Sequence, residues 1–78
     1  MESRRPLPEP TERVLTNREE ELLGLIAQGM STPEVAAQMY ISQKTVKNHL
    51  ASIFEKLDAR DRTQAVVKAV RMGIIEFR

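Results

Sequence analysis

The 78-residue sequence contains no cysteine and no tryptophan, and its only aromatic side chains are two phenylalanines and one tyrosine. Without cysteine, neither a disulfide framework nor a cysteine-based metal site can stabilise the chain, so stability has to come from helix packing. Binders of single-stranded nucleic acid usually present several aromatic platforms for base stacking. The scarcity of aromatic residues therefore argues against that class, and any nucleic-acid partner is expected to be a duplex.

Other features that the sequence lacks exclude further classes of protein. No apolar run approaches the length needed to cross a bilayer, and residues 1–10 lack the hydrophobic segment of a secretory signal, which predicts a cytoplasmic protein with no membrane partner. With a single histidine, no cysteine and no paired carboxylates in plausible geometry, neither an enzyme nor a metal site is expected. We expect no cofactor.

The length permits one domain with one small core. Residues 1–13 contain three prolines among charged side chains, a composition that cannot propagate a helix and predicts a flexible linker or arm. Residues 14–78 are then the folded domain. The formal net charge is only +1, but residues 1–40 hold four basic and seven acidic side chains, whereas residues 41–78 hold eight and four. The basic half is the candidate for binding an anionic partner.

Four helix start signals follow one another along the folded domain. In each, a side chain with a cap-forming oxygen precedes an apolar repeat, and two also carry the glutamate of an S/T-x-x-E capping box. Gly29 and Gly73 can end the first and last helices by adopting the left-handed conformation. The pattern predicts an all-α, compact four-helix domain. The predicted caps are Thr16, Ser31, Ser42 and Asp61, with Glu19 and Glu34 completing the two boxes.

Three consecutive acids, Glu19, Glu20 and Glu21, fall in the first turn of the first predicted helix. Consecutive residues on a helix point about 100° apart and cannot converge on one ion. They are therefore interpreted as capping and solvent charges.

The third predicted helix, about residues 43–57, has two different faces. One face is apolar. The opposite face begins with two ammonium groups and a carboxamide, and it contains no acid until Glu55. The helix dipole adds positive potential at the same end. This pattern favours an anionic partner, although a solvated amphipathic helix would have the same composition. The apolar face consists of Val46, Leu50, Ile53 and Leu57. The opposite face carries Lys44, Lys47, Asn48 and the small residue Ala51.

The second predicted helix is short and lies only three or four residues before the third. Two helices joined so tightly cannot lie antiparallel with a long overlap. The spacing is instead typical of a helix-turn-helix, whose second helix presents its outward face to the major groove of duplex DNA.

Several strings stand at fixed offsets along the chain: Leu15-Thr16-x-Arg18-Glu19, Ile41-Ser42-x-Lys44-Thr45-Val46-Lys47-Asn48-His49 and Arg60-Asp61-Arg62-Thr63-Gln64-Ala65. Together they resemble the LuxR/NarL/FixJ/GerE type of DNA-binding domain, over roughly residues 14–75. Two positions depart from that family: Asn17 replaces its usual proline, and Asp58 replaces its common glycine. The resemblance implies a transcriptional regulator, either the effector domain of a response regulator in a two-component system or a stand-alone protein, with RNA polymerase as a further partner.

The resemblance also implies how the domain meets DNA. The third helix would enter the major groove, where lysine can donate to guanine and asparagine can pair with adenine. His49 is either a phosphate donor or the occupant of a polar niche. The expected base contacts are Lys44, Lys47 and Asn48. The expected phosphate contacts are Ser31, Thr32, Gln43, Thr45, His49, Arg62 and Thr63.

The last predicted helix, from Asp61 to about Met72, carries more β-branched apolar surface than one packing face requires. This surplus predicts a homodimer seam formed by Val66, Val67 and Val70, which the resemblance also implies, on a two-fold related DNA site. A helix that only packs against the core is the alternative. The apolar tail at residues 74–77 is expected to fold back onto the core.

Two other functions are compatible with the same sequence. A similar helix-turn-helix occurs in the promoter-reading region of sigma factors, which would make this a promoter-recognition module. The four helices can also form a protein-interaction adaptor, with Lys44 and Lys47 facing an acidic partner.

Overall fold

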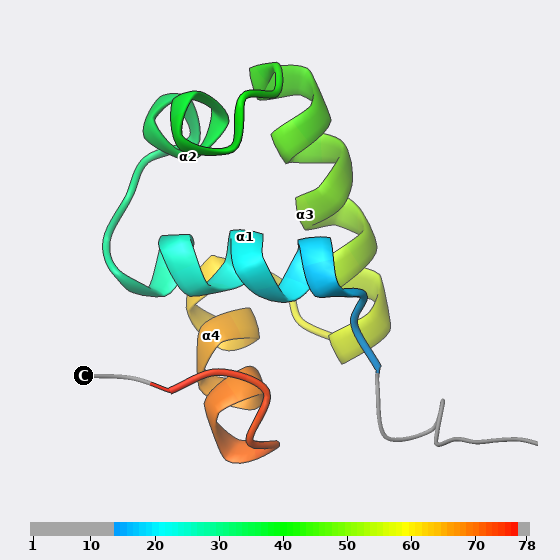
Figure 1. Ribbon diagram of the computed structural model, residues 1–78. Helices are drawn as coiled ribbons and strands as arrows, with labels where there is room; N and C mark the ends of the chain where they lie inside the picture. The colour runs from blue at the N-terminus through cyan, green and yellow to red at the C-terminus, as the bar shows by residue number, and fades with distance from the viewer. Residues whose placement is uncertain (1–13, 77–78) are drawn as a thin grey trace, which may run out of the picture.

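Four α-helices make up the fold in the computed structural model, which describes residues 14–76 (Figure 1). The predicted all-α class is confirmed, and the third helix has the bounds expected from the sequence. The predicted linker, residues 1–13, lies outside the described residues. Within residues 14–76, no helix is long and apolar enough to cross a membrane. The helices are α1 (Asn17–Ala27), α2 (Thr32–Met39), α3 (Gln43–Leu57) and α4 (Arg62–Arg71).

Every helix begins at the cap that the sequence predicts. In α1, the Thr16 hydroxyl accepts from the Glu19 amide at 3.1 Å, and the Glu19 carboxylate accepts from the Thr16 amide at 2.9 Å. The same reciprocal box starts α2. Ser42 and Asp61 each accept from the amide three residues further on, at 3.0 and 2.9 Å. Local side-chain chemistry therefore determines where all four helices start.

Helices α1 and α3 each contact the other three helices, so the core lies around them. In Figure 1, α2 lies above α1 and α4 lies below it, while α3 runs alongside. The apolar face predicted for α3 is buried, as are the inward residues of α1 and α2. Leu15, Leu22, Leu23, Ile26, Val35, Ala36, Met39, Val46, Leu50, Ile53, Leu57, Ala65 and Ala69 form the core.

Helix α4 packs on the core through its two small residues, Ala65 and Ala69, which are fully buried. Its valines lie toward the outside: 44% of Val67 and 37% of Val70 is exposed, and Val66 is half-buried against the core. Ile74 and Ile75 pack back onto the core, as expected, and Phe77 lies outside the described residues.

The C-terminal end of α3 is held by a residue of α4. Asp58 ends α3 in the left-handed conformation, at φ 54°, where the family commonly has glycine. The Lys68 ammonium donates to the carbonyl oxygens of Leu57, at 3.2 Å, and of Asp58. These carbonyls lack partners within the helix, and a cation is favourable at this end of the dipole. Lys68 therefore fixes α4 against α3.

Two glycine substitutions are expected to change stability in opposite directions. Gly24 lies inside α1 with no atom within 4 Å of an added Cβ, so Gly24→Ala should raise the free energy of unfolding by about 0.5–1 kcal/mol. Gly29 has φ 97°, so Gly29→Ala should lower the free energy of unfolding by about 1 kcal/mol. Urea denaturation of both variants beside the parent measures the two changes. If both substitutions changed the free energy of unfolding in the same direction, the helix end at Gly29 would be contradicted.

Candidate nucleic-acid interface

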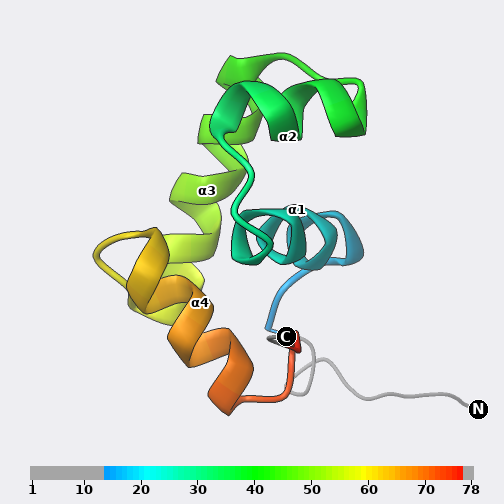
Figure 2. The same ribbon diagram turned by 90° about the vertical axis from the view of Figure 1, so that its left-hand side faces the viewer.

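Helix α3 buries one face and leaves the other open to solvent, as its sequence predicts (Figures 1 and 2). Val46 and Ile53 have no exposed surface. On the opposite side, the side chains of Lys44, Lys47 and Asn48 are exposed. Neither ammonium group is turned inward, so this face of α3 can meet a partner.

The exposed face of α3 has the chemistry of an anion-binding surface. Among residues 14–76, Lys44, Lys47 and Asn48 find no side-chain hydrogen bond or ion pair, so their donors are available. Ala51 is also exposed on α3, and its small side chain allows close approach. The first acid along the helix is Glu55. The N-terminal dipole of α3 adds to the positive potential of the two lysines.

The start of α3 is ordered by two hydroxyl groups. The Ser42 and Thr45 hydroxyl oxygens lie 2.9 Å apart, and Ser42 also accepts from the Thr45 amide. Thr45 is half-buried, whereas Gln43 is exposed. His49 is half-buried, so part of its ring stays accessible. The predicted phosphate contacts from this helix are therefore grouped around its first two turns.

Ser31, at the start of α2, lies beside a negative charge. Its amide donates to the Glu34 carboxylate at 2.8 Å, and its hydroxyl accepts from the Glu34 amide at 3.3 Å. The hydrogen bonds from the Ser31 amide and side chain hold the pKa of Glu34 below its ordinary value. A phosphate near Ser31 would meet that carboxylate, so Ser31 is less suited to bind phosphate than Thr32.

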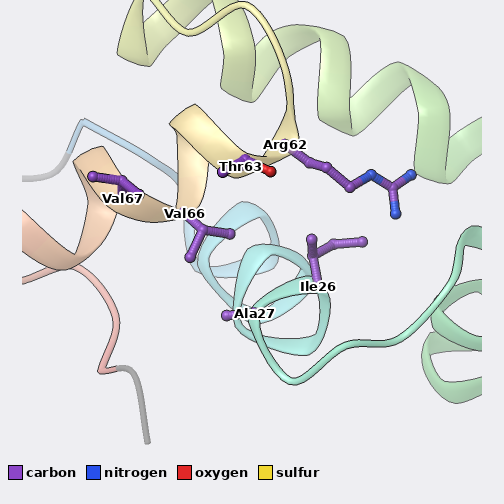
Figure 3. Close-up of a pocket in the computed structure, with 6 residues that line it drawn as sticks. All are labelled: Ile26, Ala27, Arg62, Thr63, Val66 and Val67. Carbon is purple, nitrogen blue, oxygen red and sulfur yellow. The ribbon is translucent and has the colours of Figure 1, made fainter.

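Arg62 joins the start of α4 to the start of α2. Its guanidinium donates to the Thr32 hydroxyl at 3.1 Å, which brings together two predicted phosphate contacts that are 30 residues apart. Thr63 follows Arg62 at the start of α4 and lies near Val66 (Figure 3). These residues line a shallow pocket of about 270 Å³ between α1 and α4, together with Ile26, Ala27 and Val67. The predicted phosphate contacts thus fall into separate groups.

The sequence interpretation missed an ion pair between α1 and α3. Glu19 caps α1 as predicted, but its interpretation as a solvent charge is wrong, because only 4% of it is exposed. Its carboxylate accepts from the Ser52 hydroxyl and the Lys56 ammonium, each at 2.8 Å. The only sequence signal was the four-residue spacing of Ser52 and Lys56, which places them on one side of α3.

This network keeps Glu19 ionised. Burial is the largest single influence and raises the pKa of Glu19. Hydrogen bonds from Lys56, the Thr16 amide and Ser52, with the charge of Lys56, outweigh burial and lower the pKa from 4.5 to about 2. The resulting ion pair links the start of α1 to the last turns of α3, and so contributes to the orientation of the exposed face.

The four helices and the tight α2–α3 connection define a compact helix-turn-helix domain. Residues 13–69 match the family model described as bacterial regulatory proteins, luxR family, and the chain belongs to that family. Its relatives include proteins named as a transcriptional regulatory protein and as a response regulator protein.

Individual relatives differ in how much of their length this chain covers. It is 44% identical to the spore germination protein GerE of Bacillus subtilis (strain 168), over 82% of this chain and 86% of that protein. It is 42% identical to the transcriptional regulatory protein DegU of Brevibacillus brevis, over all of this chain and 31% of that protein. For the response regulator protein VraR of Staphylococcus aureus (strain COL), identity is 48% over 81% of this chain and 30% of that protein.

A solved structure has the same fold. The structure titled transcription factor GerE superposes with a TM-score of 0.78 and 36% identity, covering 81% of this chain and 94% of that one. The chain therefore spans most of GerE and about a third of DegU or VraR, in which it corresponds to one portion of a longer protein.

Proposed function

We propose that this chain binds duplex DNA in a sequence-specific manner, with α3 in the major groove, and thereby regulates transcription. The observation that carries the proposal is the exposed face of α3, where Lys44, Lys47 and Asn48 present donors with no partner among residues 14–76. Lysine donates to guanine O6 and N7, and asparagine pairs bidentately with adenine. These three side chains are assigned to base edges.

Phosphate contacts hold α3 in register on the duplex. Gln43 and Thr45 suit phosphate oxygens at the entrance of α3, and Arg62 with Thr32 supplies a second group at the start of α2. The assignment also includes Ser31, His49 and Thr63. Ser31 lies beside Glu34, and His49 is half-buried on α3. Thr63 lines the pocket of Figure 3. Because phosphate contacts release counterions, affinity should fall steeply with salt.

Selection from a random duplex library tests the proposed function. Sequencing of the bound pool should reveal an enriched motif made of two half-sites related by a two-fold axis. Titration of that duplex at several salt concentrations should give a linear fall of log affinity with log salt. A pool without enrichment would contradict sequence-specific reading. Failure to bind any duplex would favour the protein-interaction adaptor, and a single asymmetric promoter element would favour the sigma-factor-like alternative.

Two copies are proposed to meet through α4. Val67 and Val70 are exposed on one side of this helix, and both line a shallow hollow with Val66 and Arg71. When this valine surface packs against the same surface of a second copy, apolar area is removed from water on both partners, as an isologous interface requires.

Val67→Glu is expected to abolish cooperative binding to a duplex with two half-sites, because the seam would then bury two carboxylates near the two-fold axis. Affinity for a single half-site should stay within about threefold of the parent, because one rim charge changes binding only modestly. Sedimentation velocity with each duplex gives the stoichiometry, and the parent should bind two copies to two half-sites.

Gln38→Glu is the matched control for that experiment. It adds the same charge at an exposed position of α2, away from α4. Its cooperativity should equal that of the parent. If Val67→Glu also binds cooperatively, α4 is not the seam.

A further inference from the structure

Tyr40 is the most exposed large apolar side chain among residues 14–76, with 93% of its surface accessible to solvent. It lies at the end of α2, two residues before the Ser42 cap of α3. Aromatic side chains usually stabilise a fold by burying a large area. The exposed Tyr40 ring does not contribute in this way, and its hydroxyl has no hydrogen-bond partner within the described part of the chain.

The backbone at Tyr40 is also unfavourable for tyrosine. The helix end requires a left-handed residue here, at φ 59° and ψ 42°, because the amides of Tyr40 and Ile41 turn back to the carbonyls of Ala37 and Ala36. Glycine adopts this conformation at least cost, and aspartate, which stands at Asp58, is among the residues that tolerate it. Neither burial nor backbone geometry accounts for a tyrosine at this turn.

The segment that follows Tyr40 in the sequence suits an anion. Between Tyr40 and Glu55 the chain carries Lys44 and Lys47 and no acid, and the N-terminal dipole of α3 begins two residues away. In Figure 2 the α2–α3 turn and the first turns of α3 form one edge of the molecule. Glu34 lines a hollow with Tyr40 on α2 and stays ionised, so a phosphate would have to approach the Tyr40 hydroxyl from the side of α3.

We propose that the Tyr40 hydroxyl donates a hydrogen bond to a backbone phosphate of the duplex, at the edge of the groove that α3 enters. This assignment rests on the proposed function. A phosphate contact positions the protein without reading sequence, and a neutral hydroxyl replaces no condensed counterion. Tyr40 therefore differs from a lysine contact in a measurable way.

Fluorescence anisotropy with Tyr40→Phe isolates the hydroxyl, because the ring and the backbone stay the same. Its Kd should rise about three- to tenfold on the selected duplex and by the same factor on an unrelated duplex. The slope of log affinity against log salt should equal that of the parent. Gln38→Ala, which removes another exposed side chain from the same hollow, should bind like the parent.

Tyr40→Gly supplies a second, independent readout. It should bind DNA no better than Tyr40→Phe, while its urea midpoint should exceed that of the parent because glycine relieves the left-handed backbone. Such opposite changes identify a residue kept for binding rather than stability.

The outcomes separate the phosphate contact from the proposed function. Parent-like affinity of Tyr40→Phe on both duplexes would overturn the contact and leave the ring available to a protein partner. A loss confined to the selected duplex would overturn it in favour of base reading. Failure of the parent itself to bind any duplex would instead reject the proposed function.

Discussion

Glu19→Gln is expected to lower the free energy of unfolding by about 2 kcal/mol at neutral pH. The substitution keeps the size of the side chain but removes the charge that pairs with Lys56 at 2.8 Å in a site where only 4% of Glu19 is exposed. The depression of its pKa from 4.5 to about 2 sets the upper limit, since one pKa unit corresponds to about 1.4 kcal/mol and the exposed Lys56 ammonium can return to water. Chemical denaturation at pH 7 measures the loss.

The same carboxylate predicts how stability depends on pH. Because the pKa of Glu19 is lower in the folded state, its contribution is fully present above about pH 4.5 and is lost as pH falls toward 2. The parent should therefore lose stability across this window more steeply than Glu19→Gln does. Denaturation at a series of pH values gives both curves.

Glu21→Gln is the control for both measurements. Glu21 is exposed and lies 3.7 Å from Arg18, a surface pair whose loss should change the free energy of unfolding by less than about 1 kcal/mol. If Glu19→Gln is as stable as Glu21→Gln at neutral pH, the ion pair between Glu19 and Lys56 does not stabilise the fold.

Asn48→Ala and Lys47→Ala are each expected to weaken binding to the selected duplex by about 1–3 kcal/mol, or about 5- to 150-fold in Kd. Both side chains are exposed on α3 and unpaired among residues 14–76, so the loss should come from DNA contacts and not from folding. Base preference should relax at the position that each residue reads. Anisotropy titrations against single-base variants of the site measure both effects.

Salt dependence distinguishes the two kinds of contact that Lys47 can make. If Lys47 reads a base, Lys47→Ala should relax sequence preference; if it binds phosphate, the slope of log affinity against log salt should flatten by about one unit. Arg18→Ala removes the same charge from the surface of α1, where Arg18 pairs with Glu21, and should leave base preference unchanged. Parent-like affinity and preference in both α3 variants would reject the groove assignment.

Helix starts could be predicted from the sequence because they depend on residues three positions apart. Thr16, Ser31, Ser42 and Asp61 bond to the amides of their own first turns, as expected. The apolar repeat of α3 likewise identifies its buried face without reference to other helices. The exposure of Lys44 followed from that assignment.

Contacts between distant residues could not be predicted in the same way. Glu19 meets Ser52 and Lys56 across separations of 33 and 37 residues, and its place in the capping box does not indicate that its carboxylate also pairs with α3. In α4 the sequence identified an excess of apolar side chains and assigned the valines to an outward-facing seam, with a core-only helix as the alternative. Only the structure shows that Ala65 and Ala69 make the contact with the core.

The sequence alone therefore determined the four helices, their caps and the polarity of α3, because these depend on hydrogen bonds and periodicity within about one turn. Only the tertiary structure decided which charged and polar groups pair with one another. It assigned Glu19 to Lys56, Thr32 to Arg62, and the carbonyl ends of α3 to Lys68. Each partner is chosen by how the helices cross, and crossing depends on the packing of the whole core.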